Sequence, residues 1–600
     1  MIVITGAGIL SSLGIGVDTT LQGLQSGTCG IAPPRHLTTQ HPLPVGEVPM
    51  SNAELSEAVQ AASDVTSRTA LMGIMALGEA LQSAQLSSAD LPHLALVGGT
   101  TVGNMDVTEV EFARTLHADT LGLCGMCTDQ IAAHFGEWGY VTTLSTACSS
   151  AANAFIHGAM LIESGAYDCV VVGGSEALSR FHYNGFRSLL ILDPDSCRPF
   201  DSSRAGLNLG EGAAFVVLER ESHALARGVQ PLATLSGWGN ACDAFHQTAS
   251  SEEGIGAVLA MQAALRRAGL QPTDIGYINA HGTGTPNNDA SELAAVRSVF
   301  PTLPPLSSTK SATGHTTSAS GSVEAVICLL ALQHHFLPAN LHWTSAMDED
   351  FTPVLVPTPA PQLRHVLCNA FAFGGNDTAL VFSQYDTAQS EEQPSAIPAP
   401  RAVYLHQLLR HEDLTPEDLP KIPPMVARRL TPLLKRGLQV SLAVLAKVAQ
   451  SERSNSAASS EQAATVLPSP YAQPQAIVVG TAMGCVTDTE RFLRQLVEQG
   501  EEFLSPTHFI HSTHNTLAGL VAIHTKSHGY NTTFSQGDAS YDHALRDAYL
   551  LLSQGYADNA LVGAHDERNN LAVAYYLSTS PEGAICPILP TTTFHALCPH

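Results

Sequence analysis

The sequence predicts an α/β fold built in layers, followed by a second and smaller unit of the same type. Three observations support this prediction. Short runs of β-branched residues bounded by glycine alternate with alanine-rich and leucine-rich helical patterns. The chain has 600 residues, of which 44% are hydrophobic, so it is too long for one core and apolar enough for two or more. A segment near residue 140 recurs near residue 530.

The strand-like runs are apolar throughout rather than alternating. "ALVGG" from Ala95, "DCVVVGG" from Asp168 and "AAFVVLE" from Ala213 are examples. Continuous apolar strands are typical of a sheet that helices cover on both faces, which indicates α/β layers. The N-terminal "MIVITGAGIL" has no basic region before its apolar residues, so we interpret it as a buried first strand. No apolar run reaches the roughly 18 to 20 residues of a membrane span, and we expect a cytoplasmic protein.

An internal repeat links the two ends of the chain. "GYVTTLSTACSSAANAFIHGAMLIESGAYDCVVVGG" from Gly139 aligns without a gap with "GYNTTFSQGDASYDHALRDAYLLLSQGYADNALVGA" from Gly529. Upstream, "LALVGGTTVG" from Leu94 resembles "AIVVGTAMG" from Ala476, so the order of units is preserved. We therefore interpret the C-terminal third as a duplicated half of the first domain and not as a solenoid.

The domain boundaries follow from the repeat and from two polar stretches rich in proline or serine. The first stretch, 384–400, reads as an interdomain linker, and the second, 451–475, as a long surface loop. We expect a first domain over 1–385 with halves of about 1–235 and 236–385, a linker over 386–400, and a second domain over 401–600.

Charge and cysteine content exclude several classes of function. The net charge is −26 with only 28 lysines and arginines, so we expect no nucleic-acid partner, because phosphate neutralisation requires cationic side chains. The 12 cysteines show no regular framework, and a reducing cytosol would keep them as thiols. Cys124 and Cys127 form an isolated CxxC pair, which we interpret as buried small residues rather than a zinc or redox site.

Cys148 is the candidate nucleophile. It lies in "STACSS", where the strand-like "YVTTLS" meets a long helical pattern. Free backbone N–H groups and the positive end of a helix favour a thiolate, so this position predicts a lowered pKa for Cys148. The alternative is an inert buried cysteine.

Three later motifs carry groups that such a thiol would need. "NAHGTGTPNN" carries His281, "SSTKSATGHTTSASGSVEAV" carries Lys310, His315 and Glu324, and "NAFAFGGND" is a glycine-rich turn before a strand. In this order and at these separations, TACSS, AHGTGTP, STKSATGH and FAFGG resemble the motifs of β-ketoacyl-acyl-carrier-protein synthases. The resemblance covers residues 1 to about 385 and implies the thiolase-like α-β-α-β-α fold.

The resemblance also implies a decarboxylative Claisen condensation. Cys148 would be acylated, His281 and His315 would polarise the malonyl thioester and assist decarboxylation, and Lys310 and Glu324 would order His315. Two imidazole donors aimed at the enolate oxygen stabilise charge that exists only in the transition state. A thiolase is a further possibility, but "NAFAFGGND" lacks the second cysteine of that class.

Other roles are implied by the same resemblance. The backbone N–H groups of Cys148 and Phe373 would form a second oxyanion hole, and Phe373 would be the gate of the acyl pocket. The family motif usually reads GFGGTN, and Ala372 in "AFGGND" is expected to restrict the hinge of this loop. The remaining implied residues are Phe371, Gly374 and Gly375 of the gating loop, Thr283 and Thr285 for the pantetheine arm, and Arg68 and Arg204 for carrier docking.

The implied partner is an acyl carrier protein, whose 4'-phosphopantetheine carries the substrates, and no separate cofactor is expected. A carrier protein is acidic, which conflicts with the charge of −26. Salt screens repulsion beyond roughly 8 Å, so a local basic patch would suffice. Arg428, Arg429, Lys435 and Arg436 form one candidate patch, and a solvated helix face is its simpler interpretation.

The second copy has Asp538 where the first has Cys148. A carboxylate caps a helix N-terminus well but forms no useful acyl thioester, so we expect an inactive counterpart of the nucleophile. The copy also has no counterpart of AHGTGTP or STKSATGH. His508, His511 and His514 offer three imidazoles, but no carboxylate lies between them in the sequence, and we expect no metal.

"FLSPTHFIHSTHN" and the upstream "PPMVARRL" resemble the chain-length factors that accompany ketosynthases in bacterial aryl polyene clusters. The two domains would then pair within one chain as an internal pseudo-heterodimer, favoured by the short linker. The leading function is elongation of a carrier-bound, conjugated acyl chain by two carbons. The alternatives are a general fatty-acid elongating ketosynthase and a non-catalytic chain-length or scaffold subunit.

Overall fold

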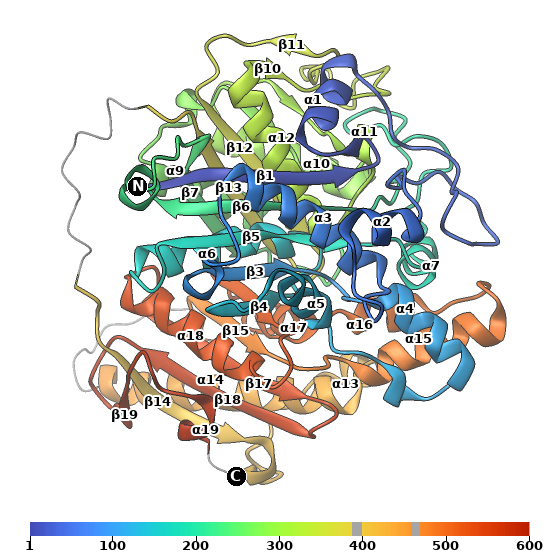
Figure 1. Cartoon of the computed structure of the whole chain (residues 1–600). Helices are drawn as coiled ribbons and strands as arrows, with labels where there is room; N and C mark the ends of the chain where they lie inside the picture. Colours follow the sequence, from blue (N-terminus) through green and yellow to red (C-terminus); the bar gives the residue numbers. More distant parts are fainter. Residues whose placement is uncertain (387–398, 458–468, 599–600) are drawn as a thin grey trace.

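The computed structural model of the chain describes residues 1–386, 399–457 and 469–598. Three five-stranded units with the same strand order make up the structure, and Figure 1 shows the first two, in blue to yellow, above the third, in orange and red. The first unit has the order β4-β3-β5-β6-β1, in which β4, β3 and β5 are parallel and β6 is antiparallel to β5 and β1. Its strands are β1 (Ile2–Ser11), β3 (Ala95–Gly99), β4 (Tyr140–Leu144), β5 (Cys169–Glu176) and β6 (Gly212–Arg220).

The second unit repeats this order as β9-β8-β12-β13-β7. Strands β9, β8 and β12 are parallel, and β13 is antiparallel to β12 and β7. A short pairing of β1 with β7 connects it to the first unit. Its strands are β7 (Ala233–Cys242), β8 (Tyr277–Asn279), β9 (Leu306–Ser307), β12 (His365–Ala372) and β13 (Asn376–Ser383).

The third unit, β16-β15-β17-β18-β14, has the order of the first, which is what the sequence repeat predicted. The short β19 (Cys586–Ile588) extends it beyond β14. Its strands are β14 (Val403–Arg410), β15 (Ala476–Gly480), β16 (Tyr530–Phe534), β17 (Asn559–Asp566) and β18 (Leu571–Ser578).

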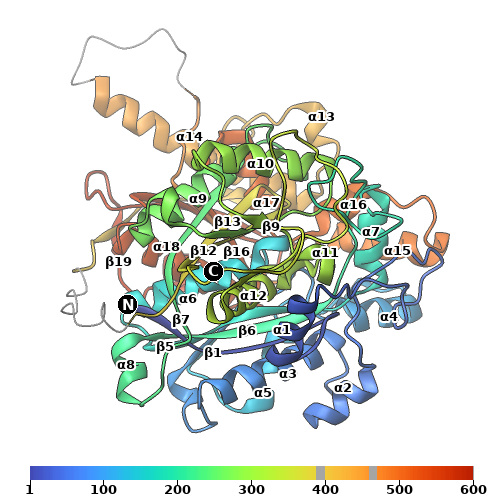
Figure 2. The ribbon, with the colours of Figure 1, turned by 90° about the horizontal axis from the view of Figure 1, so that it is seen from above.

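Helices alternate with the first two sheets in five layers, as the sequence implied, and Figure 2 shows the layers from above. The outer helices α3 and α9 pack on the first and the second sheet, and α10 packs on α9. The central helices α6 and α12 are buried along almost their whole length. A Cβ on Gly321 of α12 would lie 2.6 Å from the backbone nitrogen of Ala152, so glycine permits this close crossing. The layer helices are α3 (Arg68–Ser83), α6 (Ser150–Glu163), α9 (Ile255–Ala268), α10 (Pro286–Val299) and α12 (Ser320–His334).

In the third unit, α14 (Pro432–Ala457) covers one face of the sheet and α18 (Ser540–Ser553) packs against β15 and β17.

The prediction of a surface loop over 451–475 was wrong at its start, because residues 451–457 continue α14. Residues 458–468 of that loop and 387–398 of the predicted linker lie outside the described residues. Within the described ranges, no helix is both long and apolar enough to cross a membrane.

The remaining elements form the rims of the layers and the site. They are β2 (Gly14–Ile15), β10 (Phe336–Leu337), β11 (Thr358–Pro359), α1 (Val17–Ser26), α2 (Asn52–Val59), α4 (Met105–Thr115), α5 (Met126–Phe135), α7 (Arg180–Ser188), α8 (Glu221–Ala226), α11 (Lys310–Thr313), α13 (Pro424–Ala427), α15 (Val486–Gln499), α16 (Pro506–Ser512), α17 (Thr516–Thr525) and α19 (Phe594–Leu597).

The first and third sheets join edge to edge through β4 and β16. The backbone N–H of Ser145 donates to the carbonyl of Thr533, and that of Ser535 donates to the carbonyl of Thr143, both at 2.9 Å. These four positions are related by the 390-residue offset of the sequence repeat, so the junction has pseudo-twofold symmetry. Behind it, α6 packs on α18.

Candidate active site

Cys148 lies at a sharp turn between β4 and α6, in the short helical turn Ala147–Ser149. Ala147 has a left-handed backbone with φ of 53°, an unfavourable conformation for a residue with a side chain. Ser150 stabilises the turn, since its Oγ accepts from the N–H of Thr146 at 2.9 Å and donates to the carbonyl of Ala147 at 2.6 Å. The turn directs Cys148 inward, where it is 6% exposed.

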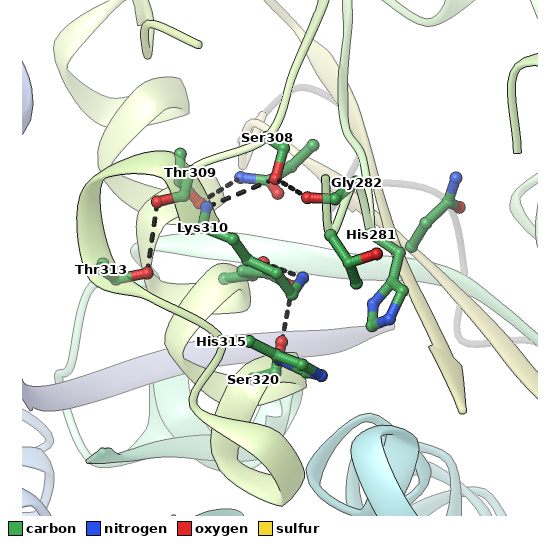
Figure 3. Close-up of polar contacts among 12 residues, drawn as sticks. His281, Gly282, Ser308, Thr309, Lys310, Thr313, His315 and Ser320 are labelled. Carbon is green, nitrogen blue, oxygen red and sulfur yellow. Dashed lines mark hydrogen bonds and ion pairs between the residues drawn. The ribbon is translucent and has the colours of Figure 1, made fainter. Parts of the chain in front are cut away.

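His281 and His315 reach Cys148 from two separate loops, one after β8 and one after α11. The Nε2 atom of His315 lies 3.1 Å from the Sγ of Cys148. The two imidazole rings have centroids 5.3 Å apart at 86°, and Figure 3 shows them reaching toward one another. The carboxylate of Glu292 fixes the first loop by accepting from the N–H groups of His281 and Gly282 at 2.8 and 2.7 Å. The structure therefore brings together the three residues that the sequence singled out for the chemistry.

Lys310 and Glu324 form a buried ion pair next to the histidines. The Nζ of Lys310 donates to Oε1 of Glu324 at 2.5 Å, and both side chains are 2% exposed. Ser320 donates to the second carboxylate oxygen at 3.1 Å. The charge of Lys310 acts on His315 and is compensated by Glu324. Removal of either partner would leave an uncompensated charge in the interior.

Burial dominates the protonation of the site. It raises the pKa of the Cys148 thiol to about 12, although the Lys310 charge and the cysteine's own backbone N–H act in the opposite direction. The prediction of a lowered pKa for Cys148 was therefore wrong, because the turn lies in the protein interior rather than at a solvated helix end. Burial, followed by the Lys310 charge, holds the pKa values of His281 and His315 well below the usual range, so both imidazoles are neutral.

The glycine-rich loop after β12 closes the site. The ring of Phe373 stacks on that of Phe186 in α7, with centroids 5.7 Å apart at 22°. Gly374 and Gly375 have φ values of 87° and 73°, whereas Ala372 is the last residue of the extended strand β12. In this conformation positive φ is needed only at the two glycines and not at Ala372, so the expected restriction of the hinge by Ala372 stays a prediction about the open loop. Phe371, on β12, lies 5.8 Å from His281, ring centre to ring centre.

A narrow cavity of about 10 Å³ extends from Cys148, with room for about one water molecule. Both domains line it, as expected if a non-catalytic partner helps to shape the acyl pocket. Phe509 of the second domain reaches the cavity because Gly185 in α7 has no side chain, and a Cβ there would lie 2.2 Å from the Phe509 ring. The other lining residues are Thr101, Val102, Ala147, Phe181, His182, Phe186, Thr317, Ser512 and Thr513.

A larger cavity, of about 1250 Å³, lies between the domains near the C-terminal end of α6. Its lining includes Glu163, Trp238, Arg267 and Tyr556, with the Arg267 guanidinium stacked on the Trp238 ring. None of the residues discussed above for chemistry lines it. The nucleophile Cys148 therefore lines the smaller cavity and not the larger one.

Thr283 and Thr285 follow His281 in the same loop, with their hydroxyls 2.9 Å apart and Thr285 directly before α10. Arg204 lies nearby and donates to the carbonyls of Asp201 and Pro286 at 3.0 and 3.1 Å. The expectation that Arg68 contributes to carrier docking was wrong. Its side chain is 6% exposed and its guanidinium is committed to the carboxylate of Glu211 at 2.6 Å.

The second copy keeps the turn and loses the nucleophile. Gly537 has φ of 55°, matching 53° at Ala147, and Ser540 makes the same two hydrogen bonds as Ser150. Asp538 is exposed and makes no cap bond to α18, whose N-cap position is Ala539. The expected capping role of Asp538 was therefore wrong. The CxxC pair is buried and reduced, with the pKa of Cys127 raised by burial to about 12.

The three histidines of the second domain do not converge on one point. His508 lies 2.8 Å from a carboxylate oxygen of Asp488, and His511 lies 3.7 Å from the other. His514 instead faces Gly484. Among the described residues, no group of three or more metal-binding side chains has a geometry that would hold an ion.

The layered fold and this buried cysteine with two histidines define a condensing enzyme of the thiolase fold. Residues 1–224 match the model of the β-ketoacyl synthase N-terminal domain, and 232–344 match that of the C-terminal domain. Residues 454–580 match a further β-ketoacyl synthase N-terminal domain model. The chain is 31% identical over 410 residues to 3-oxoacyl-[acyl-carrier-protein] synthase 2 of Staphylococcus aureus (strain N315), covering 64% of this chain and 98% of that protein. The chain belongs to the β-ketoacyl synthase family.

Two solved structures are also similar. The ketosynthase ApeO, solved in complex with its chain length factor ApeC from Xenorhabdus doucetiae, is 33% identical, with a TM-score of 0.56 over 64% of this chain and 98% of that one. The PfaC keto synthase–chain length factor has a TM-score of 0.76 over 98% of this chain and 80% of that one, at 17% identity. The second match shows that the fold of a ketosynthase with a chain length factor extends over nearly the whole chain.

Proposed function

We propose that the enzyme extends an acyl group held on an acyl carrier protein by two carbons, using malonyl-carrier protein. The Sγ of Cys148 attacks the acyl thioester carbon, and the pantetheine thiol leaves with a proton. The malonyl thioester then loses carbon dioxide, and the resulting enolate attacks the acyl-Cys148 carbonyl. The products are 3-oxoacyl-carrier protein and the free thiol. The observation that supports this most is the approach of His315 to Cys148 with His281 alongside.

The protonation states of Cys148 and the two histidines suit both acylation and condensation. Because the pKa of Cys148 is raised to about 12, the thiol has to lose its proton as it attacks, and the neutral Nε2 of His315 at 3.1 Å is placed to accept it. The neutral His281 imidazole then donates a hydrogen bond to the enolate oxygen without adding a buried charge, and His315 does the same in the tautomer that carries its proton on Nε2. Burial is the main reason that both histidines stay neutral, and the charge of Lys310 lowers their pKa values further.

The second domain acts as a non-catalytic chain-length factor in this proposal. Phe509, Ser512 and Thr513 line the cavity that extends from Cys148, so the second domain would shape the space that an acyl chain enters once this cavity widens. The resemblance of residues 401–570 to chain-length factors of aryl polyene clusters supports a polyene or related polyketide product. Products from short acyl, 4-hydroxybenzoyl-type and polyenoyl starters, identified by mass spectrometry on the carrier, test this. Exclusive extension of saturated chains would favour a general fatty-acid synthase instead, as the Staphylococcus aureus relative suggests.

Carrier docking is proposed for the surface that holds the exposed basic residues Arg428, Arg429 and Lys435, with Arg204, of which 12% of the side chain is exposed, as a second candidate. Arg428 and Arg429 directly follow α13, and Lys435 lies in the first turn of α14. An acidic carrier would meet a local positive charge here in spite of the overall −26. Reversing two of these charges, as in Arg428→Glu with Arg429→Glu, should raise KM for the carrier substrate and leave kcat unchanged.

A further inference from the structure

The loop that carries Phe373 is held from two sides. From the first domain, the N–H of Gly374 donates to the carbonyl of Gln247 at 2.7 Å, and the N–H of Asp243 donates to that of Gly375 at 2.8 Å. From the second domain, the Nδ2 of Asn515 donates to the carbonyl of Phe373 at 2.9 Å. Asn515 has no assigned role in the reaction, yet this hydrogen bond connects it to the backbone of the gating residue Phe373.

The second domain approaches the loop closely enough to require glycine on both sides. A Cβ on Gly374 would lie 2.8 Å from the Nδ2 of Asn515. A Cβ on Gly519, one turn further along α17, would lie 3.0 Å from the Cα of Gly374. The gating loop therefore packs directly on the start of α17.

Asn515 is placed for this contact at a cost to its own helix. It occupies the N-cap position of α17, where asparagine ordinarily accepts a bond from the helix backbone, yet its side chain makes no cap bond. It is 2% exposed, and its Oδ1 has no hydrogen-bond partner. A residue that served only the stability of α17 would satisfy these groups.

We propose that Asn515 is a positioning residue by which the second domain holds the gate closed. In the closed state the Phe373 ring stacks on Phe186, and the cavity of about 10 Å³ is too small for an acyl chain. Acylation of Cys148 thus requires the loop to open, whereas condensation requires the loop at its observed position, where the family resemblance implies that the Phe373 N–H completes the oxyanion hole. The hydrogen bond from Asn515 favours the closed state of the loop, which condensation requires, over the open state, which acylation requires. The inference rests on the proposed role of Phe373 as the gate.

Separate measurements of acylation and condensation distinguish a positioning role of Asn515 from a structural role. Acylation of Cys148 by hexanoyl-carrier protein is followed by intact-protein mass, and condensation is followed as a single turnover of the hexanoyl-enzyme with malonyl-carrier protein. The variants are Asn515→Ala and Asn515→Asp, of which the second keeps the shape and a favoured N-cap residue but loses the donor. The control is Gln554→Ala, which removes another hydrogen bond between the domains, from Nε2 to the carbonyl of Met160 at 3.0 Å.

Loss of one neutral hydrogen bond corresponds to about a two- to tenfold change in population. We expect both Asn515 variants to accelerate acylation by about that factor and to slow condensation by a similar factor, while Gln554→Ala changes neither. An unchanged ratio of the two rates, or a parallel fall in both, would overturn the proposal. A wild-type enzyme that acylates but never condenses would refute the proposed function instead, and its acylation rate would still test the gate.

Discussion

The sulfur of Cys148 shows how far a single residue depends on its surroundings. Its place between a strand and a helix could be predicted from the sequence, and its pKa could not. The helix terminus acts to lower the pKa, but the five layers enclose the turn, and burial raises the value to about 12. The depth of a position depends on residues that are distant in the sequence, so local motifs do not carry this information.

The pKa of Cys148 is testable by alkylation. With a pKa of about 12, the thiolate fraction rises about tenfold per pH unit, so the rate of iodoacetamide labelling should rise about 100-fold from pH 7 to pH 9. Peptide mass spectrometry separates Cys148 from the partly exposed Cys29 and Cys586. A labelling rate that is already constant above pH 7 would show that the thiolate is stabilised at rest.

His281 should matter more for decarboxylation than for acylation. Replacement by alanine removes one donor to the enolate oxygen, which typically lowers the rate by about 10² to 10³. In His281→Ala, carbon dioxide release from malonyl-carrier protein should fall by this factor while acylation of Cys148 stays close to that of the wild type. Equal losses in the two half-reactions would contradict the role given to this imidazole.

At the scale of elements, the repeat made the third sheet predictable. Glycines at matching positions and the same order of segments indicated a copy of the first unit, and β16-β15-β17-β18-β14 has its strand order. The contribution of α7 and α16 to the acyl cavity was missed. Phe509 lies in the segment that resembles chain-length factors, but its approach to α7 depends on packing at Gly185, which the sequence alone does not reveal.

The packing of α6 on α18 contains a buried polar pair that tests the junction between the domains. The Nδ1 of His157 lies 2.8 Å from a carboxylate oxygen of Asp547, and both side chains are fully buried. Asp547→Ala would leave the imidazole without its partner and should lower the free energy of unfolding by about 1–3 kcal/mol. Thermal or urea unfolding measures this change.

The matched control for the junction is Asp558→Ala. Asp558 pairs with Arg401 at 2.9 Å, with 63% and 39% of the side chains exposed. Exposed pairs contribute at most about 1 kcal/mol, so this variant should stay near the wild type. Equal destabilisation by the two variants would show that the buried pair contributes nothing specific.

For the whole molecule, the edge of the first sheet is already paired within the chain. Strand β4 meets β16, and an edge strand that is paired is not free to recruit a second copy. We therefore expect one chain per particle, with the mass of 63.1 kDa given by the sequence. Size-exclusion chromatography with light scattering on dilute protein measures it, and a stable species of two or more chains would contradict the internal pseudo-heterodimer.

The central claim is that Cys148 alone forms the acyl-enzyme and that the second domain, with Asp538 at the equivalent turn, does no chemistry. The most direct measurement is mass spectrometry of carrier-bound products after incubation with hexanoyl- and malonyl-carrier protein. The wild type and Asp538→Ala should both give the 3-oxoacyl product that is two carbons longer, and Cys148→Ala should give none. Formation of that product by Cys148→Ala would contradict the account.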